Sequence, residues 1–376
     1  MDLNVSSLAP GVAGAGIFDV FKPPSQSPKP AFELPLLQDV QKAQQVLKEN
    51  GVVRTRVVHL KTDTYLMKDV DECGGPKKID IYLKLENEQK CGTFKTRGAV
   101  NYVAGLDPEV LKQGIVTPSV GSFGQALAMI KNDNPFIPFC AALLPQDLHI
   151  YRSQLLENMG AQVHRLPFPS WWFALESRTV PPTFPIDSPL HKAHFIHPAT
   201  TACSAGDATI ALEILEDLPD VDAIVVPFCT GGFSSGVSHL LKQVNSSAKL
   251  YAAEVSSSTP LRTAMNAGTP SRCNHTPSFV DQIGGENVLP DMWNSIKASG
   301  IKDSLVVSPE QVVNAIQMML NGLNVVSEGA GAVTLAAALS GQAGAGKICC
   351  VITGGNIDPD FLTKAMHGEV PMPRFH

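Results

Sequence analysis

Short apolar runs alternate along this chain with longer stretches in which apolar residues recur every third or fourth position. A short apolar run predicts a buried strand, and the longer period predicts an amphipathic helix. The alternation is typical of βαβ units with parallel sheets, so the pattern predicts an α/β fold. The predicted strands are Ile81–Leu85, Gly114–Thr117, Phe136–Ala142, Gln162–Leu166, Ala223–Pro227, Lys249–Val255 and Lys347–Thr353. The predicted helices are Leu37–Glu49, Phe94–Ala104, Gly124–Lys131, Ile150–Met159, Ala208–Asp217, Ser234–Gln243, Pro309–Asn321 and Ala330–Leu339.

One segment, 167–189, interrupts this alternation. It carries several prolines together with Trp171 and Trp172, and its apolar positions follow no clean period. Proline clusters between periodic segments are typical of connections. We interpret the segment as a long crossover that joins two domains and lines an entrance.

Length and composition fit two compact domains. The 376 residues include 44% apolar and 17% charged side chains, which is typical of a well-packed globular protein. A net charge of −6 gives no general attraction to nucleic acid or to an anionic membrane. No apolar run reaches the ~18 residues that a membrane helix needs. Neither a nucleic acid nor a membrane is therefore an expected partner.

The N-terminal residues and the cysteines indicate a cytoplasmic protein. Residues 1–30 contain several prolines, no arginine and no basic cluster ahead of an apolar core. A targeting signal needs arginines or a basic cluster ahead of an apolar core. Because residues 1–30 lack both, we interpret them as a flexible N-terminal arm. The eight cysteines form no CxxC pair and lie mostly in apolar runs, which predicts reduced core thiols.

Three histidines, His191, His194 and His197, are the only clustered ones. On a helix, this spacing would put them on one face as metal ligands. Their segment fits a strand or a loop better, and there the three side chains do not converge. No metal site is predicted.

A lysine at a predicted strand-to-helix junction is the main candidate for chemistry. Lys95 follows the strand Ile81–Leu85, lies in a short turn with glycine and threonine, and precedes helix formers. Burial of an amine disfavours the charged ammonium and lowers its pKa, which suits Schiff-base chemistry with a carbonyl. By itself, the motif also fits an ordinary surface lysine that opens a helix.

Two loops rich in glycine and serine follow predicted strands, where open α/β sheets bind their ligands. The loop Pro118–Gly124 offers amides and hydroxyls beside a helix N-terminus, which suits a carboxylate. The loop Cys229–Gly236 matches neither a Walker loop nor GxGxxG, so it indicates a phosphate cradle without a nucleotide. Each loop alone also fits a routine turn.

Glu328 and Thr353 complete the set of candidates. Glu328 opens a helix of small residues, a position that also fits a simple helix start without a catalytic role. Thr353 puts a hydroxyl at the end of a predicted strand, before two glycines. An activated lysine, an anion-binding helix start, a phosphate cradle and a hydroxyl at a strand end together predict a pocket for pyridoxal phosphate.

In their order and spacing, these segments resemble the fold-type II pyridoxal-phosphate enzymes, in the branch of serine/threonine dehydratases and serine racemase. The matching pieces are Tyr82–Asn87, Phe94–Gly98, Gly124–Leu127, Thr209–Glu213, Glu328 and Gly354–Asn356. The resemblance implies two open, mostly parallel twisted sheets flanked by helices, with the cofactor in the cleft between a large and a small domain. The large domain would comprise residues 31–112 and 190–376, and the small domain residues 113–189.

The resemblance also implies roles for individual residues. Lys95 would form the Schiff base with pyridoxal 5'-phosphate and remove the α-proton of the substrate. The residues expected to hold the cofactor are Lys95, Phe94, Ser122, Thr230, Gly231, Gly232, Phe233, Ser234, Glu328 and Thr353. The residues expected to contact the substrate are Ser119, Val120, Gly121, Ser122 and Phe123.

Several positions depart from the family pattern. Ser122 stands where the family usually has an asparagine that contacts the phenolic oxygen of the cofactor, and Phe123 stands where histidine or alanine is common. Val120 occupies the position of the second acid/base serine of the racemase, so racemisation by that route is disfavoured. Glu254 matches one ligand of the racemase metal site, but Pro260 falls where a second carboxylate would be expected.

We therefore expect a pyridoxal-phosphate lyase of the dehydratase or ammonia-lyase type. It would act through an aminoacrylate on a β-hydroxy or otherwise β-activated amino acid, bulkier than serine or threonine. A β-replacement synthase is the main alternative, followed by an amino-acid racemase and a non-catalytic cofactor-binding paralogue. A homodimer is implied by the family resemblance alone.

Overall fold

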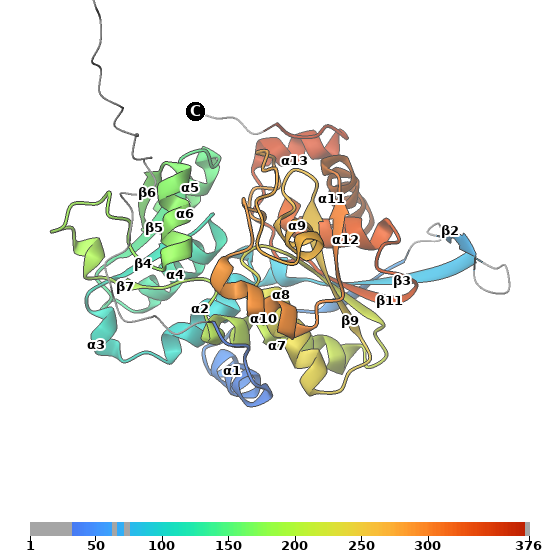
Figure 1. The fold of residues 1–376 in the computed structure, drawn as a ribbon, viewed down its shortest axis with the longest axis horizontal. Coiled ribbons are helices and arrows are strands. Elements are labelled where there is room, and N and C mark those ends of the chain that lie inside the picture. Colours follow the sequence, from blue (N-terminus) through green and yellow to red (C-terminus); the bar gives the residue numbers. More distant parts are fainter. Residues whose placement is uncertain (1–31, 62–65, 71–75, 373–376) are drawn as a thin grey trace, which may run out of the picture. The chain divides into compact units, whose positions relative to one another are not determined.

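Parallel strands with helices between them dominate the computed structural model, which describes residues 32–61, 66–70 and 76–372 (Figure 1). The chain from Phe32 onward forms one compact unit. The predicted N-terminal arm, residues 1–30, and Cys73 lie outside the described residues. The α/β class with two open, mostly parallel sheets is confirmed.

The larger sheet has the strand order β1-β3-β11-β8-β9-β10 in the described part of the chain, and β2 pairs with β3. Its parallel strands are β3 (Pro76–Lys84), β8 (Ala223–Pro227), β9 (Lys249–Val255), β10 (Asp303–Val307) and β11 (Gly346–Val351). The strands that pair antiparallel with β3 are β1 (Val57–Leu60) and β2 (Leu66–Val70). Along β8, Val225 packs into one apolar cluster, and Ile224 and Val226 pack into the cluster on the other face. Both faces of the sheet are therefore buried, as its continuous apolar runs predict.

The smaller sheet has the order β6-β5-β4-β7, and all of its pairs are parallel. Its strands are β4 (Ile115–Pro118), β5 (Cys140–Pro145), β6 (Gln162–Leu166) and β7 (His194–Phe195). In parallel sheets the carboxyl ends of neighbouring strands share one edge, and ligands bind outside that edge. The loops after β4, β8 and β11 are the ones that the sequence singles out.

Helices connect the strands of both sheets. They are α1 (Leu37–Glu49), α2 (Lys95–Ala104), α3 (Pro108–Leu111), α4 (Ser122–Asp133), α5 (Ile150–Asn158), α6 (Phe168–Ser177), α7 (Thr201–Asp217), α8 (Gly232–Gln243), α9 (Pro260–Ala267), α10 (Trp293–Ser299), α11 (Pro309–Leu323), α12 (Gly329–Leu339) and α13 (Pro359–Met366). Short 3₁₀ turns are η2 (Glu86–Glu88), η3 (Lys90–Gly92), η4 (Pro189–His191) and η5 (Pro290–Met292). No helix in the described ranges is long and apolar enough to cross a membrane.

One predicted strand is displaced. The segment Phe136–Ala142 is predicted as a strand, but β5 begins only at Cys140. β5 lies between β4 and β6, so the residues inside it need a backbone N–H for the ladder, and a proline fits only at its end, as Pro145 does. Pro138 has no N–H and cannot join an internal strand, so the strand begins after it.

The interpretation of 167–189 as an irregular crossover is wrong for its first part. Phe168–Ser177 forms the helix α6, which buries Trp171, Ala174 and Leu175 at helical spacing. The remaining face of this helix is also rich in aromatic residues, and this hides the period in the sequence. The segment after α6 is irregular, as expected.

Candidate functional site

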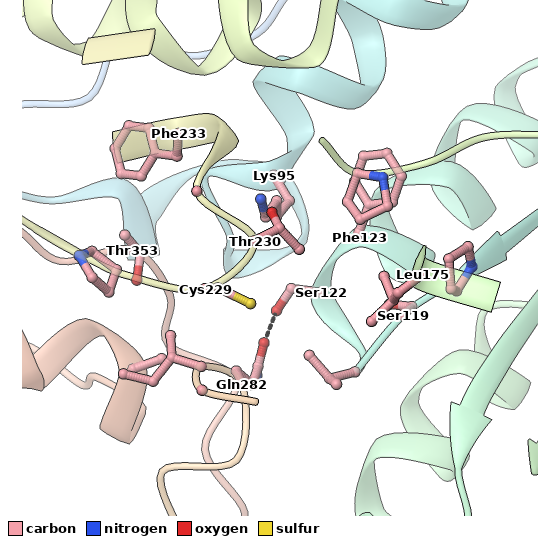
Figure 2. A pocket seen from close by; sticks show the side chains of 18 of the residues that line it. Lys95, Ser119, Ser122, Phe123, Leu175, Cys229, Thr230, Phe233, Gln282 and Thr353 are labelled. Atoms are coloured by element: carbon pink, nitrogen blue, oxygen red, sulfur yellow. Dashed lines mark hydrogen bonds between the residues drawn. The ribbon is translucent and has the colours of Figure 1, made fainter. Parts of the chain in front are cut away.

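One cavity gathers most of the residues that the sequence singles out (Figure 2). Gly121 and Gly232 do not line it, although Gly121 is the N-cap of α4 and Gly232 is the first residue of α8. The predicted residues that line the cavity are Phe94, Lys95, Ser119, Val120, Ser122, Phe123, Thr230, Gly231, Phe233, Ser234, Glu328 and Thr353.

Lys95 is the first residue of α2, and backbone contacts hold it beside the end of β11. The N–H of Phe94 donates to the carbonyl of Thr353 (3.0 Å), and Thr93 forms a β-bridge with Gly354. The Nζ of Lys95 lies 4.5 Å from the centroid of the Phe94 ring. The lysine side chain is 17% exposed, so its amine lies in a largely desolvated part of the cavity.

The turn before Lys95 depends on a close contact with Asn356. The amide of Asn356 donates to the carbonyl of Cys91 (2.7 Å) and to Oε1 of Gln125 (2.8 Å). Gly92 has φ +65°, and a Cβ there would lie 2.8 Å from Oδ1 of Asn356. Glycine is therefore required at this turn both by its backbone conformation and by the space available.

A buried ion cluster fixes α2 against β3 and α7. Arg97 pairs with Glu86 (2.8 Å) and with Glu213 (2.7 Å), and Lys84 also pairs with Glu213 (2.5 Å). Burial lowers the pKa of Arg97, but the two carboxylates outweigh it and raise this pKa above its usual value. The cluster neutralises its own charges, so it holds the helix in place without offering a free ion to the cavity.

A carboxylate that the sequence analysis missed lies behind the lysine. Oδ2 of Asp207 is 3.8 Å from Nζ of Lys95, and its other oxygen accepts the N–H of Gly98 (3.0 Å). Asp207 is buried in α7 and does not line the cavity. Burial raises the pKa of Asp207 to about 7, although Lys95 opposes this shift. The sequence signal is one acidic residue within an otherwise small and apolar helical stretch.

The loop after β8 leads into α8 through a left-handed turn. Gly231 has φ +91°, and a Cβ at this position would lie 2.7 Å from Cδ1 of Ile296. The N-terminus of α8 has no side-chain cap, so its first amides stay available to an anion in the cavity. Phe233 packs on the ring of Phe94, with 4.6 Å between the centroids, and thereby joins this loop to the lysine turn. Close by, the hydroxyl of Ser235 is buried without a hydrogen-bond partner among the described residues.

The loop after β4 is held by its own serine. Oγ of Ser119 accepts the N–H of Gly121 (3.0 Å) and the N–H of Gly124 (3.1 Å). Ser122, the first residue of α4, donates its hydroxyl to Oε1 of Gln282 (Figure 2). Val120 lines the cavity between these two serines.

Gln282 is a second residue that the sequence analysis missed. Besides accepting from Ser122, its amide donates to Oε2 of Glu328. It follows Asp281 in the long stretch between α9 and η5, which contains no helix or named strand, and such a stretch carries no periodic signal. Gln282 thus connects the substrate loop to the start of α12.

Arg152 anchors the far end of this polar chain. Its guanidinium pairs with Asp281 (2.8 Å) and with Glu328 (3.3 Å), and it also donates to the carbonyl of Asn356. Burial raises the pKa of Glu328 to about 7, although Arg152 opposes this shift. A carboxyl with such a pKa can change its protonation state near neutral pH.

Apolar side chains make up much of the cavity lining. They include Val120, Phe123, Trp171, Trp172, Leu175, Ile283 and Leu289. Lys95 is the only basic side chain among the described residues of the lining. The cavity therefore favours a ligand that combines an apolar part with anionic groups bound by backbone amides.

Glu254, which matches a metal ligand of the racemase, is occupied by protein contacts. Its carboxylate accepts the N–H groups of Leu261 (2.8 Å) and Arg262 (2.8 Å) at the start of α9, and the hydroxyl of Ser304. Within the described ranges, no group of three or more His, Cys, Asp or Glu side chains is placed to hold a metal ion. His197 hydrogen-bonds with Arg178.

Comparisons with known proteins identify a family whose cofactor fits the residues that line this cavity. Residues 67–354 match the family model described as pyridoxal-phosphate dependent enzyme. The chain is 32% identical to L-threonine ammonia-lyase of Thermotoga maritima over 336 residues, which cover 88% of this chain and 78% of that protein. It is 28% identical to serine racemase of Dictyostelium discoideum over 316 residues, which cover 82% of this chain and 93% of that protein.

A solved structure is similar over nearly its whole length. The crystal structure of a pyridoxal 5'-phosphate-dependent aspartate racemase superposes with a TM-score of 0.73 at 26% identity. The match covers 89% of this chain and 99% of that one. The similar proteins thus include both ammonia-lyases and racemases.

Proposed function

The chain belongs to the pyridoxal-phosphate dependent enzymes of fold type II, in the branch of threonine dehydratases and serine racemases, and we propose that it is a lyase of that branch. Its proposed reaction removes the β-substituent of a β-hydroxy or otherwise β-activated amino acid, and it yields a 2-oxo acid and ammonia after hydrolysis. The observation that carries elimination over racemisation is Val120, a cavity-lining side chain of the substrate loop that cannot transfer a proton.

Pyridoxal 5'-phosphate fits the residues of this cavity. The uncapped amides at the start of α8 suit its phosphate, and Gly231 leads into them through a left-handed turn in which a Cβ would collide with Ile296. We assign the amine of Lys95 to its aldehyde and the hydroxyl of Thr353 to its ring nitrogen. When bound, the cofactor withdraws electrons from the α-carbon of the amino acid.

The protein residues perform the remaining tasks in this proposal. The amine of Lys95 takes the α-proton of the substrate, since it lies in the cavity and is largely shielded from water. The N-terminus of α4 binds the substrate carboxylate through the first-turn backbone amides that Ser119 does not take. Trp171 and Trp172 line the cavity and exclude water from the reacting atoms.

The hydroxyls of the substrate loop further support elimination. Ser119 holds the backbone of the loop by accepting hydrogen bonds from the N–H groups of Gly121 and Gly124, and the Ser122 hydroxyl donates a hydrogen bond to Gln282. The hydroxyl oxygen of Ser119 and the O–H donor of Ser122 are therefore engaged in structural contacts. A racemase needs a second group that returns a proton to the α-carbon from the other side.

We further propose that the side chain of the substrate is bulky and uncharged. The aromatic and aliphatic lining of the cavity, with Trp172 and Leu175, favours an apolar group. A second carboxylate on the substrate would need a free cation. Arg152 cannot serve as that cation, because Asp281 and Glu328 already neutralise it.

Three broader assignments accompany this proposal. The large domain comprises residues 31–112 and 190–376, and the small domain comprises residues 113–189. The enzyme is a homodimer, as the family resemblance implies. We assign it to the cytoplasm, where the cysteines of the described residues would stay reduced.

The experiment that tests the proposal follows absorbance and products together. The purified protein is mixed with cofactor, and a band at ~410–420 nm is expected from its bond to the lysine. β-Substituted amino acids with small, bulky apolar and acidic side chains are then added, and ammonia and 2-oxo acid are measured. Release of both products from a bulky apolar substrate, without any co-substrate, is the expected result.

Matched variants give this experiment its controls. Lys95→Ala should abolish the band and the turnover, whereas Lys112→Ala, an exposed lysine paired with Glu109, should change neither. Formation of the mirror-image amino acid without ammonia would identify a racemase. Product formation that requires an added nucleophile would identify a β-replacement synthase.

A further inference from the structure

The amine of Lys95 has a buried carboxylate on the side away from the cavity. Asp207 Oδ2 lies 3.8 Å from the lysine Nζ, and the two side chains come from α7 and α2. The carboxylate is 2% exposed and does not line the cavity. A substrate in the cavity and Asp207 therefore approach the same nitrogen from different directions.

The close packing of α2 on α7 builds this arrangement. A Cβ on Gly98 would lie 2.7 Å from Oδ1 of Asp207, and a Cβ on Gly206 would lie 2.6 Å from the carbonyl oxygen of Arg97. Both positions thus need glycine if the helices are to approach this closely. The N–H of Gly98, which donates to Oδ1, then fixes the orientation of the carboxylate.

The charges around Asp207 leave Lys95 as its partner. Arg97 and Glu86 also act on it electrostatically, from α2 and η2, and Cys203 on its own helix faces it as a thiol. Arg97 is already paired with Glu86 and Glu213. The amine of Lys95 is therefore the cation, among the described residues, that is within ion-pair distance of Asp207.

We propose that Asp207 is a positioning residue that strengthens Lys95 as a base, by stabilising the positive charge that the amine acquires when it takes a proton. A desolvated ammonium is costly, and a carboxylate within about 4–6 Å favours it by one to three pKa units. The inference rests on the role of Lys95 in the proposed function, but it adds a residue that acts only through the lysine.

The proton transfer is balanced without any further reagent. The α C–H bond of the substrate breaks, an N–H bond forms on the amine of Lys95, and the bonding pair stays with the substrate. Above its pKa of about 7, the carboxylate of Asp207 is ionised and faces the new ammonium. The gap of 3.8 Å shortens by about 1 Å to hydrogen-bond length through the flexible lysine side chain.

A test on cofactor-free protein separates this proposal from the identity of the substrate. Reductive methylation of Lys95 is followed by mass spectrometry over a pH series in the wild type, in Asp207→Asn and in Glu216→Gln. Asparagine keeps an oxygen for the N–H of Gly98 but removes the charge. The pH midpoint of labelling should fall by about one to three units in Asp207→Asn. The midpoint of labelling should not move in Glu216→Gln. The carboxylate that this control removes lies on the same helix as Asp207 and pairs with Arg54.

An unchanged midpoint in Asp207→Asn would overturn the proposal, even if the lyase activity is established. Conversely, a shifted midpoint in a protein without lyase activity would leave Asp207 as the partner of Lys95 and overturn only the proposed reaction. In the enzyme with bound cofactor, Asp207→Asn should lower kcat about tenfold with little change in KM. A weaker base slows proton transfer by less than the full change in its pKa.

A second measurement tests the coupling of Lys95 and Asp207 through thermal stability. In Lys95→Met the carboxylate of Asp207 loses its cation, so adding Asp207→Asn should raise the midpoint of thermal unfolding at pH 8. In the wild-type background the same substitution should lower this midpoint. Equal effects in both backgrounds would show that the two side chains are not coupled, and the proposal would be wrong.

Discussion

Glu328 illustrates, at the scale of the residue, how surroundings decide the chemistry of a side chain. The sequence places it at a helix start, where an exposed glutamate would stay ionised. In the structure it is buried and contacts Arg152 and Gln282. Burial is the main cause that raises its pKa to about 7.

This shift predicts a pH dependence of stability that Glu328→Gln removes. Between the ordinary pKa near 4.5 and the folded value near 7, the folded protein binds a proton that the unfolded chain releases. The free energy of unfolding contributed by Glu328 therefore falls as pH rises through this window. Urea unfolding of the cofactor-free protein from pH 5 to pH 8 should show a steeper fall for the wild type than for Glu328→Gln. Parallel curves would contradict this, and Glu216→Gln serves as the exposed control.

Gly231 forms the left-handed turn of the proposed cofactor cradle. Gly231→Ala should cost stability through its left-handed backbone, by about 1–2 kcal/mol. It should also weaken cofactor binding by at least about tenfold, because the new Cβ meets Ile296 at 2.7 Å and moves the loop. Fluorescence titration of the cofactor-free protein measures this affinity.

Gly268→Ala is the matched control for Gly231→Ala. Gly268 has φ +72° at the end of α9, and its Cβ would have no neighbour within 4 Å. It should therefore lose a similar amount of stability and keep its cofactor affinity. Equal affinity losses in both variants would show that backbone strain alone, not the shape of the cradle, is responsible.

At the scale of the element, α9 depends on a side chain from the neighbouring strand. Glu254, in β9, accepts two backbone N–H groups at the start of this helix. Glu254→Gln replaces one acceptor with a donor that faces those N–H groups. We expect it to lower the free energy of unfolding by about 1–3 kcal/mol in urea.

Two controls decide between this role and a metal site. Glu310→Gln, an exposed substitution in the first turn of α11, should stay within about 0.5 kcal/mol of the wild type. Added Mg²⁺ should leave the unfolding curve of the wild type unchanged, because the carboxylate of Glu254 is occupied. If Mg²⁺ stabilises the wild type but not Glu254→Gln, then Glu254 is a metal ligand and this account of α9 is wrong.

At the scale of the whole molecule, the cavity joins parts that flank both sheets. Its lining includes the loop after β4 of the smaller sheet and the loops after β8 and β11 of the larger one. A cofactor bound there should stabilise both parts together. At a concentration of about one hundred times its dissociation constant, it should add ~2.7 kcal/mol to the free energy of unfolding.

Thermal unfolding with and without cofactor checks this coupling. We expect one transition that moves as a whole to higher temperature, with circular dichroism and tryptophan fluorescence giving the same midpoint. Two transitions, of which cofactor shifts only one, would show that the two sheets unfold independently. Lys95→Met, which cannot bond to the cofactor, should show a smaller shift.

Much of the fold was predictable, because continuous apolar runs such as Ala223–Pro227 have few alternatives to a buried strand. The helix at 168–177 was not predictable, since its aromatic residues face several directions and mask its period. The strand β10 was missed because its run is only five residues long and begins with the polar Asp303 and Ser304, which leaves a weak apolar pattern. Local patterns therefore predict a helix or strand well where its apolar residues form one unbroken run or follow one clear period.

The sequence by itself determined the α/β fold, the family and most of the predicted residues that line the cavity, since these lie in short motifs at strand ends. Only the tertiary structure placed Asp207 behind Lys95 and Gln282 against Ser122. Each of these pairs joins residues that are distant in the chain, and the contact exists because helices and loops pack closely through positions such as Gly98. Burial, which sets the pKa of Asp207 and Glu328, arises from the same packing and leaves no local pattern in the sequence.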